Sequence, residues 1–342
     1  MNFKGYWLIN YYLKNYRKYR QYKKRFAPRP YVCMFSVTNN CTSQCIMCNF
    51  WKQDHKDELT LNEIKDIFSQ DFFKDIEVVS ITGGDPLLRQ DLAEIIDIIY
   101  AQVKKPMCVA TSGLLPHKLD ELLSKKKNKL SGIHLSIDGL EEVHNYIRGR
   151  TDAFRRTVEC IEVVRKHGFA PGITMTAMKA NYDQLLKTKE YFRDCTFGYK
   201  TVQCSKFYFG DNKDFDITLD ENMKASLIEQ IRQIPITNLY TAFLEDWILY
   251  GRRPLPCYAG LASFYLDSTG NIYPCVHKGS WGNVRQTPID QIWQSPQAVR
   301  FRNMHKNCQD CYERCSVDTF AIDEPYWVIK HRIRQLRKRL KK

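Results

Sequence analysis

The sequence predicts an α/β fold, a partial (β/α)6 barrel over residues 31–215 followed by a small C-terminal cysteine-rich domain. Two observations predict this fold. Apolar, β-branched runs alternate with segments whose apolar residues recur every three or four positions, which is typical of parallel strands joined by helical crossovers. Beyond the barrel, five cysteines gather between residues 257 and 315. Six strand–helix units suit an open barrel better than the eight of a closed one.

Six continuous apolar runs are predicted to be parallel strands, because such runs suit a sheet covered on both faces. In chain order they are Val32–Val37, Ile76–Ile81, Met107–Ala110, Ile133–Ile137, Ile173–Met178 and Val202–Phe209. The predicted helices between them include Leu61–Phe68, Leu92–Val103, Phe154–His167 and Tyr182–Phe192. Functional groups of such barrels lie on the loops that follow the strands. These loops include Asn39–Trp51, Gly83–Arg89, Thr111–Gly113 and Asp138–Arg150.

Four further segments complete the predicted organisation. They are a basic, aromatic N-terminal helical segment (1–30), a helical connector (216–253), the cysteine-rich domain (254–320) and a basic amphipathic C-terminal helix (321–342). Within the cysteine-rich domain, Phe264–Leu266 and Ile272–Tyr273 flank an Asp-Ser-Thr-Gly turn, which predicts a hairpin.

The composition excludes several classes of protein. No apolar run approaches the ~20 residues that a membrane-spanning helix needs, and the N-terminus has no secretory signal, so we predict a cytoplasmic protein. In that compartment 13 cysteines indicate metal or cluster ligation rather than disulfides. Five cysteines outside the dense groups are predicted to be small buried hydrophobes: Cys33, Cys108, Cys160, Cys195 and Cys204.

The first dense group is Cys41, Cys45 and Cys48, on the loop after the first predicted strand. Thiolates bind [4Fe–4S] clusters, which usually take four of them. Three thiolates leave one iron open to a substrate or cofactor. The alternative is a zinc site with Cys33 as the fourth ligand, although Cys33 lies at the far end of the strand and zinc prefers a closed tetrahedral set.

The Cys-x3-Cys-x2-Cys spacing after the first strand of a partial barrel resembles the radical S-adenosylmethionine (SAM) superfamily. The resemblance implies that the open iron binds the amino and carboxylate groups of SAM. It further implies reductive cleavage of SAM to methionine and a 5′-deoxyadenosyl radical, which abstracts hydrogen from a substrate. The residue before the third cysteine is usually aromatic in the family and is Met47 here.

Three further stretches match the family in the expected order. Thr82 to Pro86 resembles the Gly-Gly-Glu-Pro motif that holds the SAM amino group, with Asp in place of Glu, and two glycines leave room for a ligand near the backbone. Ser136 and Asp138 resemble the strand-four residues that face the SAM ribose, and Arg148 matches an arginine on the SAM carboxylate. By this resemblance the predicted SAM-binding residues are Met47, Gly83, Gly84, Asp85, Pro86, Ser112, Ser136, Asp138 and Arg148.

The second dense group resembles the SPASM/twitch extension that follows many radical SAM barrels. Its candidate ligands are Cys257, Cys275, Cys308, Cys311 and Cys315. Five cysteines suffice for one auxiliary [4Fe–4S] cluster with one to spare, which favours the single-cluster twitch type. A zinc ribbon is the alternative, because paired cysteines serve either metal.

The net charge of +14 is concentrated at the two ends of the chain. Residues 1–30 hold nine Lys or Arg and residues 326–342 hold eight, with no acid in either, so the 295 residues between them sum to −3. The ends could pack on the barrel with solvated charge, attach to an anionic membrane surface, or bind nucleic acid or an acidic peptide. Because the residues between the two ends are nearly neutral in sum, they offer no continuous basic surface for a phosphate backbone, which disfavours nucleic-acid binding.

Our hypothesis from the sequence is a radical SAM oxidoreductase that acts on a peptide or protein side chain, with a flavodoxin or ferredoxin as electron donor. The first alternative is radical modification of a membrane-associated lipid or glycan precursor, with the basic ends as peripheral anchors on the inner membrane face. The second is a zinc-stabilised interaction protein without enzymatic activity. No catalytic acid or base is assigned, and structural roles are expected for Tyr208, Asp211 and Asp267.

Overall fold

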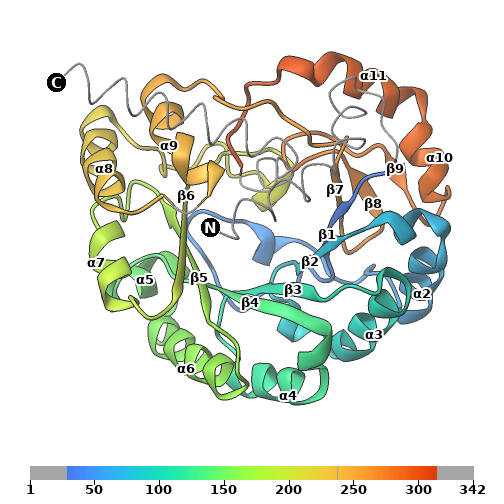
Figure 1. The fold of residues 1–342 in the computed structure, drawn as a ribbon, viewed down its shortest axis with the longest axis horizontal. Helices are drawn as coiled ribbons and strands as arrows, with labels where there is room; N and C mark the ends of the chain where they lie inside the picture. The colour runs from blue at the N-terminus through green and yellow to red at the C-terminus, as the bar shows by residue number, and fades with distance from the viewer. Residues whose placement is uncertain (1–28, 237, 314–342) are drawn as a thin grey trace, which may run out of the picture.

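The computed structural model describes residues 29–236 and 238–313, and its centre is one sheet of nine strands (Figure 1). The strand order is β6-β5-β4-β3-β2-β1-β7-β8-β9. Strands β1 to β6 are parallel to their neighbours and form the predicted partial barrel. The strands are β1 (Val32–Ser36), β2 (Val78–Thr82), β3 (Met107–Thr111), β4 (Leu130–Ser136), β5 (Gly172–Ala177), β6 (Thr196–Thr201), β7 (Ser263–Leu266), β8 (Asn271–Tyr273) and β9 (Gly282–Asn283).

Helices follow one another around the outside of the sheet (Figure 1). The longer ones are α2 (Leu61–Ser69), α3 (Leu92–Val103), α4 (Pro116–Lys126), α5 (Glu141–Arg148), α6 (Ala153–Lys166), α7 (Leu185–Tyr191), α8 (Glu221–Gln233), α9 (Leu239–Tyr250), α10 (Ile289–Gln294) and α11 (Pro296–Met304). Short 3-10 turns include Phe50–Lys52, Pro86–Leu88 and Tyr208–Gly210. Helix α2 illustrates the local logic, because Thr60 and Glu63 form a capping box at its start and its apolar face is buried.

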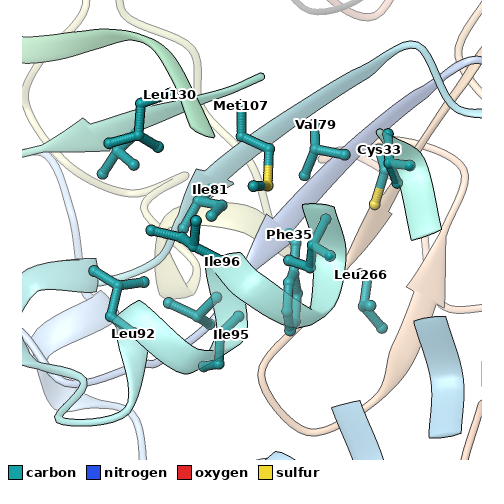
Figure 2. Packing of buried hydrophobic residues seen from close by; sticks show 14 of the residues in the cluster. Cys33, Phe35, Val79, Ile81, Leu92, Ile95, Ile96, Met107, Leu130 and Leu266 are labelled. Carbon is teal, nitrogen blue, oxygen red and sulfur yellow. The ribbon is translucent and has the colours of Figure 1, made fainter. Parts of the chain in front are cut away.

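The barrel core lies between the sheet and its helices, where apolar side chains of β1 and β2 meet those of α3 (Figure 2). Cys33 lies in this core with no exposed surface, beside Phe35 and Val79. Burial raises the pKa of its thiol far above the usual value. Cys160 is equally buried. Both therefore pack as small hydrophobes, and Cys33 is placed in the core rather than as a fourth ligand of the triad.

The sixth predicted strand, Val202–Phe209, is wrong. Strand β6 lies earlier, at Thr196–Thr201, and pairs along its whole length with β5. Because β5 ends at Ala177, the following residues have no partner strand, and the chain turns away. The predicted loop Asp138–Arg150 also differs, since it contains helix α5.

The predicted hairpin in the cysteine-rich segment is present as β7 and β8, which pair antiparallel. Strand β7 additionally pairs parallel with β1, from Val32 opposite Ser263 to Phe35 opposite Leu266. The two cysteine-bearing segments therefore share one sheet. The domain boundaries at 215 and 253 stay predictions, and the terminal segments predicted for 1–30 and 321–342 lie outside the described residues apart from 29 and 30.

Candidate functional site

The triad of Cys41, Cys45 and Cys48 lies on the loop that leaves β1, and its thiols are close enough to influence one another. Burial raises the pKa of Cys41 to about 11 and that of Cys48 to about 12, and the neighbouring thiols add to both effects. Backbone N–H groups of Ser43 and Phe50 donate to the sulfurs of Cys41 and Cys48, the latter at 3.4 Å. Thiolates gathered in so dry a site require a compensating cation.

Arg148, at the end of α5, supplies that cation. Its Nη1 lies 3.6 Å from the Cys45 sulfur, and its Nη2 lies 2.6 Å from Oδ2 of Asp138. The backbone N–H of Thr176 donates to the other oxygen of Asp138 at 3.0 Å, which fixes the carboxylate. His144 accepts from the Asp138 backbone N–H through Nδ1 at 3.0 Å. Burial, together with Arg148, lowers the pKa of His144 to about 2, so the imidazole is neutral.

The glycine pair after β2 packs directly on the triad loop. A Cβ on Gly83 would lie 2.4 Å from the carbonyl oxygen of Thr38, and one on Gly84 would lie 2.3 Å from that of Asn40. The Gly84 N–H donates to the Thr38 carbonyl at 2.8 Å. Close approach of two backbones, which only glycine allows, therefore already accounts for both residues without a ligand.

The carboxylate of Asp85 is fully buried. It accepts hydrogen bonds from donors on its own loop and on the neighbouring loop. Its oxygens accept from the Thr111 hydroxyl at 2.8 and 2.9 Å, from the Leu87 N–H at 3.1 Å, and from the N–H and hydroxyl of Ser112. Burial raises the pKa of Asp85, and the hydroxyl donors oppose this shift. Asp85 and Ser112 thus tie the loops after β2 and β3 together, and direct SAM contact by either stays a prediction.

The other predicted SAM-binding residues occupy different surroundings. Met47 is buried against Ile147 and Met178, which makes an apolar wall beside the triad. Ser136 ends β4 and is half-buried. Pro86 is buried at the start of a short 3-10 turn. The structure brings the triad, Met47, Asp138 and Arg148 together. The charge of Asp85 also acts on Cys41, while its oxygens accept hydrogen bonds from the loops after β2 and β3.

Two residues that the sequence did not single out hold the start of the triad loop. Oε1 of Glu58 accepts from the Thr38 hydroxyl at 2.9 Å and from the Asn39 N–H at 2.5 Å. Arg89 lies 3.7 Å from Oε2 of Glu58 and donates to the Val37 carbonyl at 2.9 Å. Glu58 stands in a hydrophilic, highly charged stretch, so the sequence carries no signal for this role.

A second site gathers four cysteines of the C-terminal segment: Cys257, Cys275, Cys308 and Cys311. Burial raises the pKa of Cys275 strongly, and the other three thiols add to the effect. Arg253, also missed from the sequence, joins two of the contributing stretches because Nε donates to the Leu255 carbonyl at 2.7 Å and Nη1 to that of Cys311 at 2.9 Å. The remaining candidate, Cys315, lies outside the described residues.

Within residues 29–236 and 238–313, no three His, Cys, Asp or Glu side chains form a group that could hold one metal ion. A zinc ion requires its ligands to converge on one point, whereas thiolates of an iron–sulfur cluster bind separate irons. The three-thiol and four-thiol sets, with an arginine beside the first, suit such clusters.

A cleft of about 100 Å³ lies between the triad loop and the second site. It is lined by Asn39, Phe50, Gln53, Phe207, Tyr265, Asp267, Tyr273, Cys275 and Val276. Asp267 is occupied by its own hairpin, accepting from the Thr269 and Asn271 backbone N–H groups at 3.0 and 2.8 Å and from the Tyr273 hydroxyl at 3.0 Å. These contacts support the structural role expected for Asp267. The carbonyl oxygen of Asp211 also has a structural contact, with Asn49.

An open parallel barrel with three thiols after its first strand, joined to a four-thiol segment, defines an iron–sulfur enzyme. Residues 35–192 match the radical SAM superfamily, and residues 257–312 match the SPASM iron-sulfur cluster-binding domain. The chain therefore carries a radical SAM domain followed by a SPASM domain. Its cofactors are SAM with a [4Fe–4S] cluster and auxiliary iron–sulfur ligation, so the non-enzymatic alternative is set aside.

Among curated proteins, the chain is 24% identical to the AdoMet-dependent heme synthase of Methanosarcina barkeri, over 89% of this chain and 97% of that protein. It is also 24% identical to the subtilosin biosynthesis protein AlbA of Bacillus subtilis, over 79% of this chain and 60% of AlbA. The chain therefore spans about 60% of the length of AlbA.

Two solved structures share the fold. Streptococcus suis SuiB bound to S-adenosylmethionine matches with a TM-score of 0.62 at 17% identity, over 85% of this chain and 72% of SuiB. The anSMEcpe enzyme with bound AdoMet matches with a TM-score of 0.63 at 14% identity, over 89% of this chain and 99% of that one. Among the described helices, none has the length and apolar character needed to cross a bilayer.

Proposed function

We propose that the chain is a peptide- or protein-modifying radical SAM enzyme with two iron–sulfur centres. The proposed ligands of the SAM-binding cluster are Cys41, Cys45 and Cys48. The proposed ligands of a single auxiliary [4Fe–4S] cluster are Cys257, Cys275, Cys308 and Cys311. This division is supported by the mutual influence of the thiols within each group and by the four thiolates that such a cluster takes.

The residues around the triad have separate tasks in this proposal. Arg148 offsets thiolate charge and presents a cation for the SAM carboxylate, while Asp138 orients that cation through their 2.6 Å contact. Met47 keeps water from one side of the site, because it packs into an apolar cluster. When bound, the cluster and SAM supply a 5′-deoxyadenosyl radical, which takes hydrogen from the substrate.

The cleft is the observation that carries the peptide assignment. One wall is the triad side, with Phe50 and Gln53, and the other is the auxiliary side, with Tyr273 and Cys275. Aromatic rings bury apolar side chains, and amides such as that of Gln53 can hydrogen-bond a peptide backbone. Among the similar structures, SuiB is known with its precursor peptide SuiA and anSMEcpe with the Cp18Cys peptide.

Attachment to a membrane, and hence the lipid or glycan alternative, depends on basic segments outside the described residues. A flavodoxin or ferredoxin remains the expected electron donor. We expect no pelleting of the protein with phosphatidylglycerol vesicles if the ends pack on the barrel. Pelleting that disappears when residues 326–342 are removed would instead favour the membrane alternative.

The activity is tested by reducing anaerobically purified protein with dithionite in the presence of SAM. We expect about eight irons per chain, four for each cluster, and formation of 5′-deoxyadenosine measured by chromatography. The combined change Cys41→Ala, Cys45→Ala and Cys48→Ala abolishes the product, whereas Cys195→Ala, outside both groups, leaves it unchanged. Product formation by the triple variant at the original rate contradicts the proposal.

The substrate class is tested with a pool of synthetic peptides of random sequence. We expect the pool to raise 5′-deoxyadenosine formation and mass spectrometry to find peptides of altered mass. Phosphatidylglycerol vesicles carrying cell-derived lipids serve as the parallel sample. Modified lipid without any modified peptide would contradict the peptide assignment while leaving the SAM chemistry intact.

A further inference from the structure

The segment that follows β6 lies between the two cysteine groups. Residues 203–212, here called the bridge loop, contain a turn in which Phe209, Gly210 and Asp211 have φ values of 64°, 67° and 60°. Residues other than glycine rarely adopt this left-handed backbone conformation, so contacts with neighbouring residues must stabilise the turn. A Cβ on Gly210 would come within 2.8 Å of the backbone carbonyl carbon of Asn49. The turn is therefore pressed against the triad loop.

One end of the bridge loop forms hydrogen bonds with the residues on both sides of Cys48, the third cysteine of the triad. Nδ2 of Asn212, whose residue is 1% exposed, donates to the carbonyl oxygen of Met47 at 2.8 Å. The backbone N–H of Asn49 donates to the carbonyl oxygen of Phe209 at 2.6 Å. Cys48 stands between Met47 and Asn49. Its position thus depends on contacts with residues more than 150 positions later in the chain.

The other end of the bridge loop forms a hydrogen bond with the segment that carries the auxiliary cysteines. The hydroxyl of Ser205 donates to the carbonyl oxygen of Val276 at 2.5 Å, and Val276 directly follows Cys275. The Ser205 N–H donates to Oδ1 of Asn212 at 2.8 Å. These buried hydrogen bonds form a continuous path from the residue after Cys275 to Met47.

We propose that Ser205 and Asn212 are positioning residues that couple the two cluster sites, so that the geometry of one ligand segment sets that of the other. This inference rests on the ligand sets proposed above. Each residue acts through the backbone next to a cysteine rather than on a thiol. Buried hydrogen bonds have no water to replace a lost partner, so breaking the path at one end loosens the ligand segment at the other.

The decisive test is whether each change disturbs the site that its side chain does not reach. In the holoenzyme, Ser205→Ala removes the bond to the auxiliary segment. We expect it to shift the part of the electron paramagnetic resonance spectrum that responds to SAM, which belongs to the triad cluster. Ser205→Thr keeps a hydroxyl and is expected to restore the original spectrum. Asn212→Ala should conversely alter the auxiliary signal.

Ser280→Ala is the matched control. Ser280 lies in the same C-terminal segment, and its hydroxyl donates to the carbonyls of Ile272 and Gly282, not to the bridge loop. We expect it to leave the SAM-responsive signal unchanged. A wild-type signal in Ser205→Ala, or the same shift in Ser280→Ala, overturns the proposal.

A second measurement does not require the clusters. In the iron-free full-length chain we expect Ser205→Ala to raise the iodoacetamide alkylation rate of Cys48 about fivefold, the order expected from one lost buried hydrogen bond. Cys195, distant from both groups in sequence, is the internal reference. An unchanged Cys48 rate refutes the coupling. A raised rate in a chain that binds no iron would instead refute only the proposed function.

Discussion

The two cysteine sites differ in how the protein offsets the charge of the thiolates. The triad comes from a single loop and has a buried arginine, Arg148, 3.6 Å from Cys45. The auxiliary group draws on separate stretches of chain, and Lys278, which acts on Cys308, is shared with Asp310 at 2.5 Å. A fixed cation suits a site with three thiolates that is proposed to accept the carboxylate of a ligand. At the auxiliary site the neighbouring cation, Lys278, is instead paired with a carboxylate, that of Asp310.

The largest expected effect comes from removing that cation. Arg148→Met leaves the carboxylate of Asp138 buried without its partner, which costs about 3–5 kcal/mol in comparable buried pairs. We expect 5′-deoxyadenosine formation to fall at least about 100-fold, with the auxiliary iron retained. Iron analysis and chromatography measure both.

Arg148→Lys is the control for charge alone, because lysine keeps the cation but loses the planar fork. We expect an intermediate rate. If Arg148→Met removes iron from both sites equally, the claim that a fixed cation serves the triad and not the auxiliary site is wrong.

A moderate effect is expected at Asp85, whose charge acts on Cys41 in the first site only. Because burial raises its folded pKa, the stability it contributes is fully present below its unfolded pKa of about 3.9 and is lost as pH rises through the folded pKa. Asp85→Asn lacks this loss, so its stability relative to the wild type should improve with rising pH. Urea denaturation at several pH values above about 3.9 measures the difference in unfolding free energy between Asp85→Asn and the wild type. A difference that does not change with pH would contradict the raised pKa of Asp85.

The smallest effect is expected for Cys315→Ala. If four cysteines complete the auxiliary site, iron content and SAM cleavage remain as in the wild type. Cys308→Ala, in the same stretch of sequence, should instead remove about four irons. Equal iron loss in the two variants would place Cys315 among the ligands.

Local signals in the sequence predicted much of the fold. The bounds of α3 are as predicted, because its apolar spacing and its flanking polar residues agree. The triad and the hairpin of β7 and β8 also stand out as short motifs. Strand β6 did not, because the predicted strand began at Val202, where the partner strand β5 has already ended. Strand length there is set by pairing, which a local pattern does not contain.

The supporting contacts of the candidate site were even less accessible from sequence. Glu58, Arg253 and Asn212 are ordinary polar residues whose importance arises only when distant backbone groups are brought beside them. The hydrogen bonds of Asp85 could not be foreseen for the same reason, because Thr111 and Ser112 donate to it from another loop, and its contact with SAM stays a prediction. Motifs reveal ligands, whereas the residues that hold the ligands depend on tertiary contacts.

The pairing of β7 with β1 also governs how the protein is made. Until Leu266 has left the ribosome, one side of β1 is an open edge with unpaired backbone groups. The sheet on this side of β1 is therefore completed only by a strand more than 200 residues later in the chain. Contacts between residues so far apart in sequence form slowly. During that interval the open edge of β1 is available for pairing with other chains, which favours aggregation until the C-terminal segment is complete.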